Sequence, residues 1–215
     1  MLDLRAILFD FDGVLADTAA DNLAAWNYAL EPFGVQIQAR DYLLREGTIL
    51  QRLATGFLEL YGADTAHAPE VVSRREEWSR KYHTPKLFPD AVNIVKQITA
   101  LGLKTALVSA ASRERLNHPS LSKLRAALSA IISSQDCKEG KPSPEPYLLG
   151  AKELGIEPKD CLVVENAPFG VRAAKSAGMT CVAITTTVSA EDLSQADYIL
   201  SSLSELSGLI TKLKH

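Results

Sequence analysis

Six short apolar runs recur along the chain, and helix-like stretches separate most of them. The runs cover residues 6–11, 105–108, 130–132, 161–164, 180–184 and 198–200. Each run has the length and composition of a strand that is buried on both faces. Between the runs, apolar residues recur every three or four positions, as in an amphipathic helix. This alternation predicts an α/β fold with a doubly wound, Rossmann-like core and a parallel sheet.

One long segment, residues 17–85, breaks the alternation. It contains no convincing strand, and its apolar residues follow the helical period at Leu23, Trp26, Leu30 and Phe33, and again at Ile49, Leu53, Phe57 and Leu60. A stretch of this length is too long for a loop inside a compact domain. We therefore expect an inserted all-helical cap domain at 17–85 and an α/β catalytic core formed by 1–16 and 86–215.

Composition and charge narrow the class of protein. Hydrophobic residues make up 47% of the chain, and the formal net charge is -3 with no basic stripe, so we expect neither nucleic acid nor a membrane as a partner. The apolar start is interrupted by Asp10 and Asp12 and lacks a cationic leader, which is unlike a signal peptide. We expect a cytoplasmic protein whose three cysteines are small buried hydrophobes. The sequence makes no prediction of the oligomeric state.

Polar side chains follow the first four predicted strands. They are Asp10 and Asp12, then Ser109, then Lys141, and then Glu165 with Asn166. Ligands of open parallel sheets bind beyond the carboxyl ends of the strands. These side chains are therefore expected to meet at one edge of the sheet. Because an ideal strand sends alternate side chains to opposite faces, the turn at Gly13 must help to bring Asp12 to that edge.

This set of side chains suits phosphoryl transfer. The reaction needs an oxygen nucleophile, a cation beside the phosphate, positioned donors and a proton donor. Oxygens of Asp10 and Asn166 could bind Mg²⁺, which prefers a few hard oxygen ligands and keeps several waters. Lys141 would neutralise phosphate, and Ser109 with backbone N–H groups such as that of Ala110 would hold its oxygens.

Four motifs in order carry a family resemblance. They are Asp-Phe-Asp-Gly-Val-Leu at 10–15, Ser109, Gly-Lys-Pro-Ser-Pro-Glu-Pro-Tyr at 140–147, and Val-Val-Glu-Asn-Ala-Pro-Phe-Gly-Val at 163–171. In these motifs the chain resembles the haloacid dehalogenase-like hydrolase superfamily, and more narrowly its β-phosphoglucomutase and phosphoglycolate phosphatase-like branch with a helical cap. The resemblance covers essentially the whole chain.

The resemblance implies a role for each matching residue. Asp10 would form an aspartyl-phosphate, and Asp12 would protonate the leaving oxygen and then activate water. Ser109 and Lys141 would bind phosphate. Mg²⁺ would bind Asp10, the backbone carbonyl of Asp12 and the residue at position 166, with Glu165 in or near the coordination shell.

The chain departs from the family pattern at Asn166, where family members have an acidic residue. Because the amide of Asn166 is neutral, the site has one negative charge fewer, and Glu165 or another carboxylate could replace that charge. In the predicted cap, Arg45 and Glu46 fall where related proteins place a substrate-facing loop. They are therefore candidates for contact with substrate or metal, although they could equally form a charged pair on the cap surface.

Plainer structural interpretations stay open at several positions. Thr18 could cap a helix after the first strand, Asn166 could cap the helix led by Pro168, and Arg113 and Arg115 could face either the phosphate site or solvent. A bare Asp-x-Asp-Gly also occurs in calcium loops, but the glutamate that ends such a loop is missing here.

The leading functional hypothesis is a magnesium-dependent phosphohydrolase that acts on a small phosphorylated metabolite. A hexose-phosphate mutase is the alternative enzyme, and its cap would need a basic phosphate anchor, for which Arg45 or Arg52 are candidates. A non-catalytic module that binds a phosphorylated metabolite is the alternative of another class, suggested by the loss of the acid at position 166.

Overall fold

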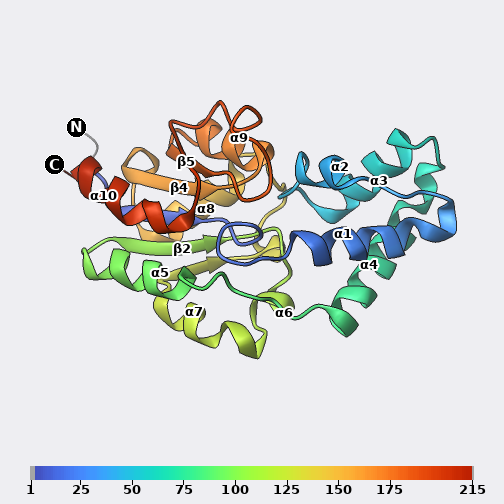
Figure 1. Ribbon diagram of the computed structural model, residues 1–215, viewed down its shortest axis with the longest axis horizontal. Helices are drawn as coiled ribbons and strands as arrows, with labels where there is room; N and C mark the ends of the chain where they lie inside the picture. The colour runs from blue at the N-terminus through green and yellow to red at the C-terminus, as the bar shows by residue number, and fades with distance from the viewer. Residues whose placement is uncertain (1–2, 215) are drawn as a thin grey trace.

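The computed structural model of the chain (Figure 1) describes residues 3–214. Its centre is a six-stranded sheet in the order β3-β2-β1-β4-β5-β6, and every neighbouring pair is parallel. The strands are β1 (Ala6–Phe9), β2 (Lys104–Val108), β3 (Ala130–Ile132), β4 (Cys161–Glu165), β5 (Thr180–Ile184) and β6 (Tyr198–Leu200). The predicted α/β class is confirmed. The chain winds outward in both directions from β1 and β4, and this switch point is where ligands bind in such sheets.

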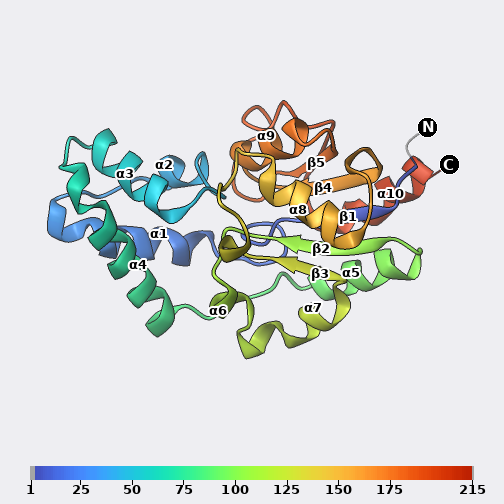
Figure 2. The same cartoon turned by 180° about the vertical axis from the view of Figure 1, so that it is seen from behind.

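Helices cover both faces of the sheet (Figures 1 and 2). They are α5 (Ala91–Ala100), α7 (Ser122–Ala127) and α10 (Leu206–Lys214) on one face, and α8 (Glu145–Leu154) and α9 (Pro168–Ser176) on the other. Ile7 and Phe9 pack with Ile94 of α5, whereas Leu8 packs with Tyr147 of α8. Since successive side chains of a strand point to opposite faces, a continuous apolar run is what a sheet covered on both sides requires.

The first strand is shorter than the predicted run of residues 6–11. It ends at Phe9, although the N–H of Asp10 still donates to the carbonyl of Val164 at 3.0 Å. The chain then turns, because the carbonyl of Phe11 accepts from the N–H groups of Leu15 and Ala16, both at 3.0 Å. The apolar character of Phe11 reflects burial in a turn rather than a position in the strand.

Four helices lie beyond the carboxyl ends of the strands (Figures 1 and 2). They are α1 (Ala19–Leu30), α2 (Ala39–Leu43), α3 (Leu50–Leu60) and α4 (Ala68–Tyr82). These helices bury an apolar cluster of their own, in which the rings of Trp26 and Phe57 meet edge to face at 5.2 Å between centroids. Fully burying such a ring stabilises the fold by about 2 kcal/mol. The predicted insertion is therefore helical and has its own core.

Two linkers join these helices to the sheet, and they pair with each other. The N–H of Asp17 donates to the carbonyl of Lys86 at 2.8 Å, and the N–H of Phe88 donates to the carbonyl of Leu15 at 3.0 Å. The pairing holds both linkers beside the end of β1, close to the predicted boundaries at 16/17 and 85/86. We refer to residues 17–85 as the cap and to the remainder as the core.

None of the helices within residues 3–214 is both long enough and apolar enough to cross a membrane. All three cysteines are free, and Cys161 and Cys181 are buried in the sheet.

Candidate active site

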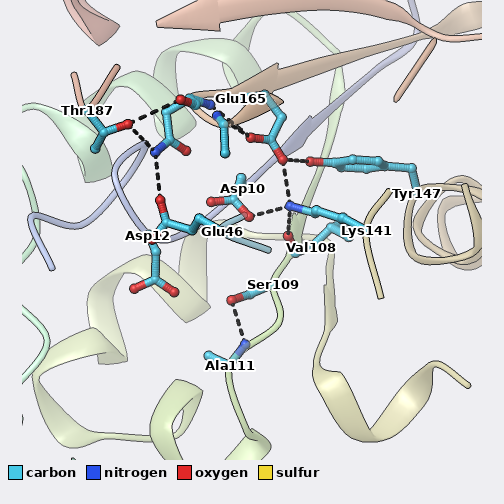
Figure 3. Close-up of polar contacts among 12 residues, drawn as sticks. Asp10, Asp12, Glu46, Val108, Ser109, Ala111, Lys141, Tyr147, Glu165 and Thr187 are labelled. Atoms are coloured by element: carbon cyan, nitrogen blue, oxygen red, sulfur yellow. Dashed lines mark hydrogen bonds and ion pairs between the residues drawn. The ribbon is translucent and has the colours of Figure 1, made fainter. Parts of the chain in front are cut away.

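A buried lysine lies at the carboxyl edge of the sheet. Lys141 is only 1% exposed, and its Nζ donates to the carboxylate of Asp10, to Glu165 Oε1 at 2.7 Å and to the carbonyl of Val108 at 3.4 Å (Figure 3). Asp10 follows β1, Val108 ends β2 and Glu165 ends β4, so the lysine joins three neighbouring strands. The structure therefore brings together the predicted residues Asp10, Lys141 and Glu165.

Glu165 is fully engaged by donors. Its Oε1 also accepts from the hydroxyl of Tyr147 at 2.6 Å, and its Oε2 accepts from the backbone N–H groups of Asn166 and Ala167 at 2.9 and 3.2 Å (Figure 3). Gly170 leaves the space for this carboxylate, because an added Cβ would lie 1.8 Å from Oε1. Four donors on two oxygens fix Glu165 as a support for Lys141.

The electrostatics of this cluster leave an excess of negative charge. Burial raises the pKa of Asp10 to about 8, and the ammonium group of Lys141 acts against this shift. Burial also opposes the charge on Lys141, but Asp10 and Glu165 outweigh it and raise the pKa of the lysine. One cation is thus shared by two buried carboxyl groups, an arrangement that a further cation would stabilise.

Asp12 lies in a different environment. Its carboxylate accepts from Nη1 and Nη2 of Arg115 at 3.2 and 2.5 Å, from the hydroxyl of Thr18 at 2.5 Å and from Nδ2 of Asn22 at 3.2 Å. Burial alone would raise the pKa of Asp12, but Arg115 and the two neutral donors lower it below its ordinary value. Asp12 is therefore held as a carboxylate between the core and the cap.

Two sequence interpretations change at this point. Thr18 precedes α1, but its hydroxyl makes no helix-capping hydrogen bond and donates to Asp12 instead. Arg115, for which both solvent and the site remained open, has a side chain that is only 11% exposed and forms the ion pair with Asp12. The signal that could have identified Arg115 is its position in a short helix that follows the loop after β2.

Asn166 is completely buried and has one unpaired atom. Its Nδ2 donates to Glu46 Oε2 at 3.2 Å and to the hydroxyl of Thr187 at 2.9 Å, whereas Oδ1 has no hydrogen-bond partner in the described part of the chain. Gly13 fits against this amide, since its φ is 79° and an added Cβ would lie 2.2 Å from Nδ2. The residue that precedes α9 is Ala167, so Asn166 is not the helix cap that its position suggested.

These groups fit a magnesium ion. Within residues 3–214 there is no group of three or more His, Cys, Asp or Glu side chains placed to hold a metal. Mg²⁺ needs fewer protein ligands, because it usually binds through one or two carboxylates and keeps several waters. The carboxyl group of Asp10 and the unpaired Oδ1 of Asn166, at the ends of adjacent strands, provide hard oxygens of this type.

The cap reaches the site through the loop before α3. Glu46 is 4% exposed and accepts from the hydroxyl of Tyr42 at 2.5 Å as well as from Asn166. Burial, with Asp12 nearby, raises the pKa of Glu46 well above its ordinary value. Gly47 has a φ of 91°, and an added Cβ would lie 2.8 Å from Cδ of Lys141. The cap loop thus lies directly on the buried lysine.

The remaining predicted site residues differ in their placement. Ala110 lines the cavity between cap and core, while the Ser109 hydroxyl, on the same loop, accepts from the N–H of Ala111 at 3.0 Å (Figure 3). Arg45 does not line that cavity, and its Nη1 donates to the carbonyl of Asp41 at 2.9 Å. Of the two cap candidates, the structure brings only Glu46 to the other site residues.

A cavity of about 230 Å³ separates the cap from the core. The core contributes Asp10, Asp12, Ala110 and Arg115 to its lining, and the cap contributes Trp26, Glu46, Arg75 and His83. Sequence analysis assigned no site role to Arg75 or His83, because an isolated basic residue on a helix carries no motif. The cavity opens on both aspartates and is the natural place for a substrate.

Comparisons with known proteins agree with this geometry. A family model described as haloacid dehalogenase-like hydrolase matches residues 7–184. Fructose-1-phosphate phosphatase YqaB of Escherichia coli (strain K12) is 30% identical over 82% of this chain and 94% of its own length. Protein SUPPRESSOR OF QUENCHING 1, chloroplastic, of Arabidopsis thaliana is 32% identical over 90% of this chain, which spans only 19% of that longer protein.

Among solved structures, a protein from Bacteroides vulgatus proposed to be a beta-phosphoglucomutase has a TM-score of 0.86 and 27% identity. The similarity covers 100% of this chain and 92% of that one. Sequence motifs, fold and relatives agree, and the chain therefore belongs to the haloacid dehalogenase-like hydrolase family of enzymes.

Proposed function

We propose that this protein is a magnesium-dependent phosphohydrolase that acts on a small phosphorylated metabolite through an aspartyl-phosphate intermediate on Asp10. The observation that supports it most is the buried carboxyl group of Asp10, which is paired with Lys141 and lines a cavity. A carboxylate held by one lysine at the end of a strand has the position of a nucleophile for a phosphate ester.

The proposed reaction has two steps. In the first, a carboxylate oxygen of Asp10 forms a bond to phosphorus while the bond to the leaving oxygen breaks, and Asp12 gives that oxygen a proton. In the second, Asp12 takes a proton from water, the water oxygen bonds to phosphorus, and the bond to Asp10 breaks with release of phosphate. Lys141, Ser109 and the N–H of Ala110 bind the phosphate oxygens. Asp12 must leave Arg115 to take part in either step, because Arg115 holds it as a carboxylate; without that ion pair burial raises the pKa of Asp12, which lets it carry the proton that the first step needs.

The proposed metal ligands are the carboxylate of Asp10, the backbone carbonyl of Asp12 and Oδ1 of Asn166. When bound, Mg²⁺ neutralises phosphate charge and orients the phosphoryl group. Glu165 is assigned to the positioning of Lys141, because four donors already occupy its two oxygens. Glu46, which is hydrogen-bonded to Asn166, brings a further carboxyl group from the cap; burial and Asp12 raise its pKa, and a bound cation would favour its charged form.

Phosphate release from a panel of phosphorylated metabolites tests the proposal. We expect release that requires Mg²⁺ and that Asp10→Asn abolishes. Asp17→Asn is the matched control, because Asp17 is exposed and lies in the same segment. Release that persists in Asp10→Asn contradicts the nucleophile, and binding of phosphate compounds without any turnover supports the non-catalytic alternative.

The mutase alternative is favoured by the similarity to the Bacteroides vulgatus protein. Neither Arg45 nor Arg52, the predicted phosphate anchors, lines the cavity. The alternative predicts that glucose 1-phosphate, supplied with a bisphosphate activator, is converted to glucose 6-phosphate. Release of inorganic phosphate without glucose 6-phosphate supports the hydrolase.

A further inference from the structure

The cavity is lined by polar side chains that lack hydrogen-bond partners. Within residues 3–214, seven buried side-chain nitrogen and oxygen atoms are unpaired. Five of them belong to residues that line the cavity: Trp26 Nε1, Thr48 Oγ1, Arg75 Nε, His83 Nε2 and Arg115 Nε. Buried polar groups are almost always paired in folded proteins. The wall of this cavity therefore holds polar groups that no other group of the described chain satisfies.

Among the residues that line the cavity, Arg75 gives the strongest indication of an anionic ligand. It lies on α4 and is 8% exposed, and its guanidinium group lies over the ring of Trp26 at 5.6 Å from the centroid. Its Nη2 donates to the neutral Oδ1 of Asn22 at 3.1 Å. No carboxylate of the described chain forms an ion pair with Arg75, whereas Arg115 pairs with Asp12 and Lys141 pairs with Asp10. A buried cation without a counter-ion is unfavourable, and an anion in the cavity would remove that cost.

We propose that Arg75, with Nε1 of Trp26 beside it, binds a second anionic group on the leaving-group side of the substrate. This inference rests on the proposed function and narrows its substrate class. The substrate is compact and carries a phosphoryl group at the Asp10 end and a phosphate or carboxylate at the cap end. A phosphorylated neutral sugar leaves the positive charge of Arg75 unpaired. Charge-assisted, bidentate hydrogen bonds are what arginine offers to phosphate and carboxylate.

Matched substrates that differ in the distal charge test the inference. Phosphoglycolate and ethane-1,2-diol bisphosphate, whose distal groups are a carboxylate and a phosphate, are each compared with the neutral 2-hydroxyethyl phosphate, all at a fixed Mg²⁺ concentration. We expect kcat/KM to be at least about tenfold higher for the anionic member of one pair, in keeping with a charged hydrogen bond. The pair that shows the preference identifies carboxylate or phosphate as the distal group.

Variants then assign the preference to Arg75. We expect Arg75→Gln to lower kcat/KM for the preferred anionic substrate about tenfold, by raising KM. For the neutral substrate of the same pair, kcat/KM should change less than about twofold. Arg75→Lys keeps the charge and should restore part of the loss. Arg74→Gln is the matched control, because Arg74 is adjacent, contacts Tyr28 and does not line the cavity.

The outcomes separate the inference from the proposed function. If Arg75→Gln lowers turnover of the anionic and neutral substrates equally, Arg75 acts only through Asn22 and Asp12, and the inference is overturned. A wild-type preference for the neutral substrate overturns it as well, while the hydrolase proposal stands. Absence of Mg²⁺-dependent hydrolysis for every compound in a broad panel overturns the hydrolase proposal itself.

Discussion

The two walls of the cavity differ in how their charges are satisfied. On the core wall, Lys141 is shared by Asp10 and Glu165, and Arg115 is paired with Asp12. On the cap wall, no ion pair of Arg75 and no acceptor for Nε1 of Trp26 is found among residues 3–214. The charged groups of the core wall are therefore paired within the chain, whereas we propose that the substrate pairs the charge of Arg75 on the cap wall.

This difference separates reaction chemistry from substrate choice. Groups that stabilise a reacting phosphoryl group work best when they are fixed in advance, because reorganisation would otherwise add to the barrier. Groups that select a substrate must instead favour one ligand over another. A buried donor does so because it stays unpaired, at a cost in binding free energy, when the bound ligand has no acceptor for it.

Removal of Lys141 should have the largest effect. Lys141→Met leaves two buried carboxyl groups facing each other, so we expect turnover to fall about 10³-fold or more and the free energy of unfolding to fall by about 3 kcal/mol. Enzyme kinetics and urea unfolding measure the two effects. Lys138→Met, an exposed change in the same loop, should match the wild type. A Lys141→Met enzyme with normal turnover would show that the core wall is not prearranged.

Removal of Arg115 should destabilise the fold in a pH-dependent way. Asp12 has a lowered pKa, so its ion pair contributes stability above the pKa of the unfolded state, near 4, and that contribution is lost as the pH falls through the folded pKa. We expect Arg115→Met to cost about 3 kcal/mol at pH 7 and progressively less towards pH 3. Urea unfolding across this range measures it. Arg113→Met is the control on the same helix, and a pH-independent cost would contradict the assignment.

A methyl group at Gly47 should separate the cap from the core. Gly47→Ala requires a left-handed backbone at a non-glycine residue and places a carbon against Lys141, so we expect kcat/KM to fall about tenfold to hundredfold. Steady-state kinetics measure this effect, and thermal unfolding should show a loss of about 1 kcal/mol, because movement of the cap relieves the contact with Lys141 but not the backbone strain at residue 47. Gly56→Ala, at a helical position with open space, is the control. Equal losses in both variants would point to the cap fold rather than to its contact with the core.

The smallest effect concerns His83 on the cap wall. Burial, with Arg115 nearby, lowers the pKa of His83 to about 4 from an unfolded value of 6.5. Protons therefore bind the unfolded state first, and stability present above pH 6.5 is lost as the pH falls towards 4, by about 2 kcal/mol. His83→Gln should flatten this part of the stability profile, as measured by urea unfolding. His67→Gln, an exposed change in the cap, should keep the wild-type slope.

Much of the fold could be predicted because parallel strands that are buried on both faces have continuous apolar sequences. Five of the six runs lie within one residue of the observed strands, and only the run at 6–11 extends into the turn after Phe9. The meeting of Asp10, Lys141 and Glu165 followed from the rule that parallel strands present their carboxyl ends at one edge. Local patterns together with sheet geometry were sufficient for this part of the site.

The other half of the site could not be predicted in the same way. Arg75 and His83 reach the cavity only because α4 packs at a particular angle against α1 and the core, and a helical period does not fix that angle. Thr18 has the composition of a helix cap, yet the nearby carboxylate of Asp12 competes for its hydroxyl. Side chains whose role depends on the packing of two domains are the ones that local sequence patterns leave undetermined.

The amide of Asn166 has a consequence for how the two domains communicate. A carboxylate at this position has no N–H to donate to Glu46, whereas the Nδ2 of asparagine donates to it. Because Glu46 belongs to the cap, the carboxyl group that we propose as the replacement for the lost acid lies beside the proposed cation only when the cap is docked, and the cation would favour its charged form. By thermodynamic reciprocity, a cation that favours the docked cap is itself bound more tightly by the docked cap, by the same factor.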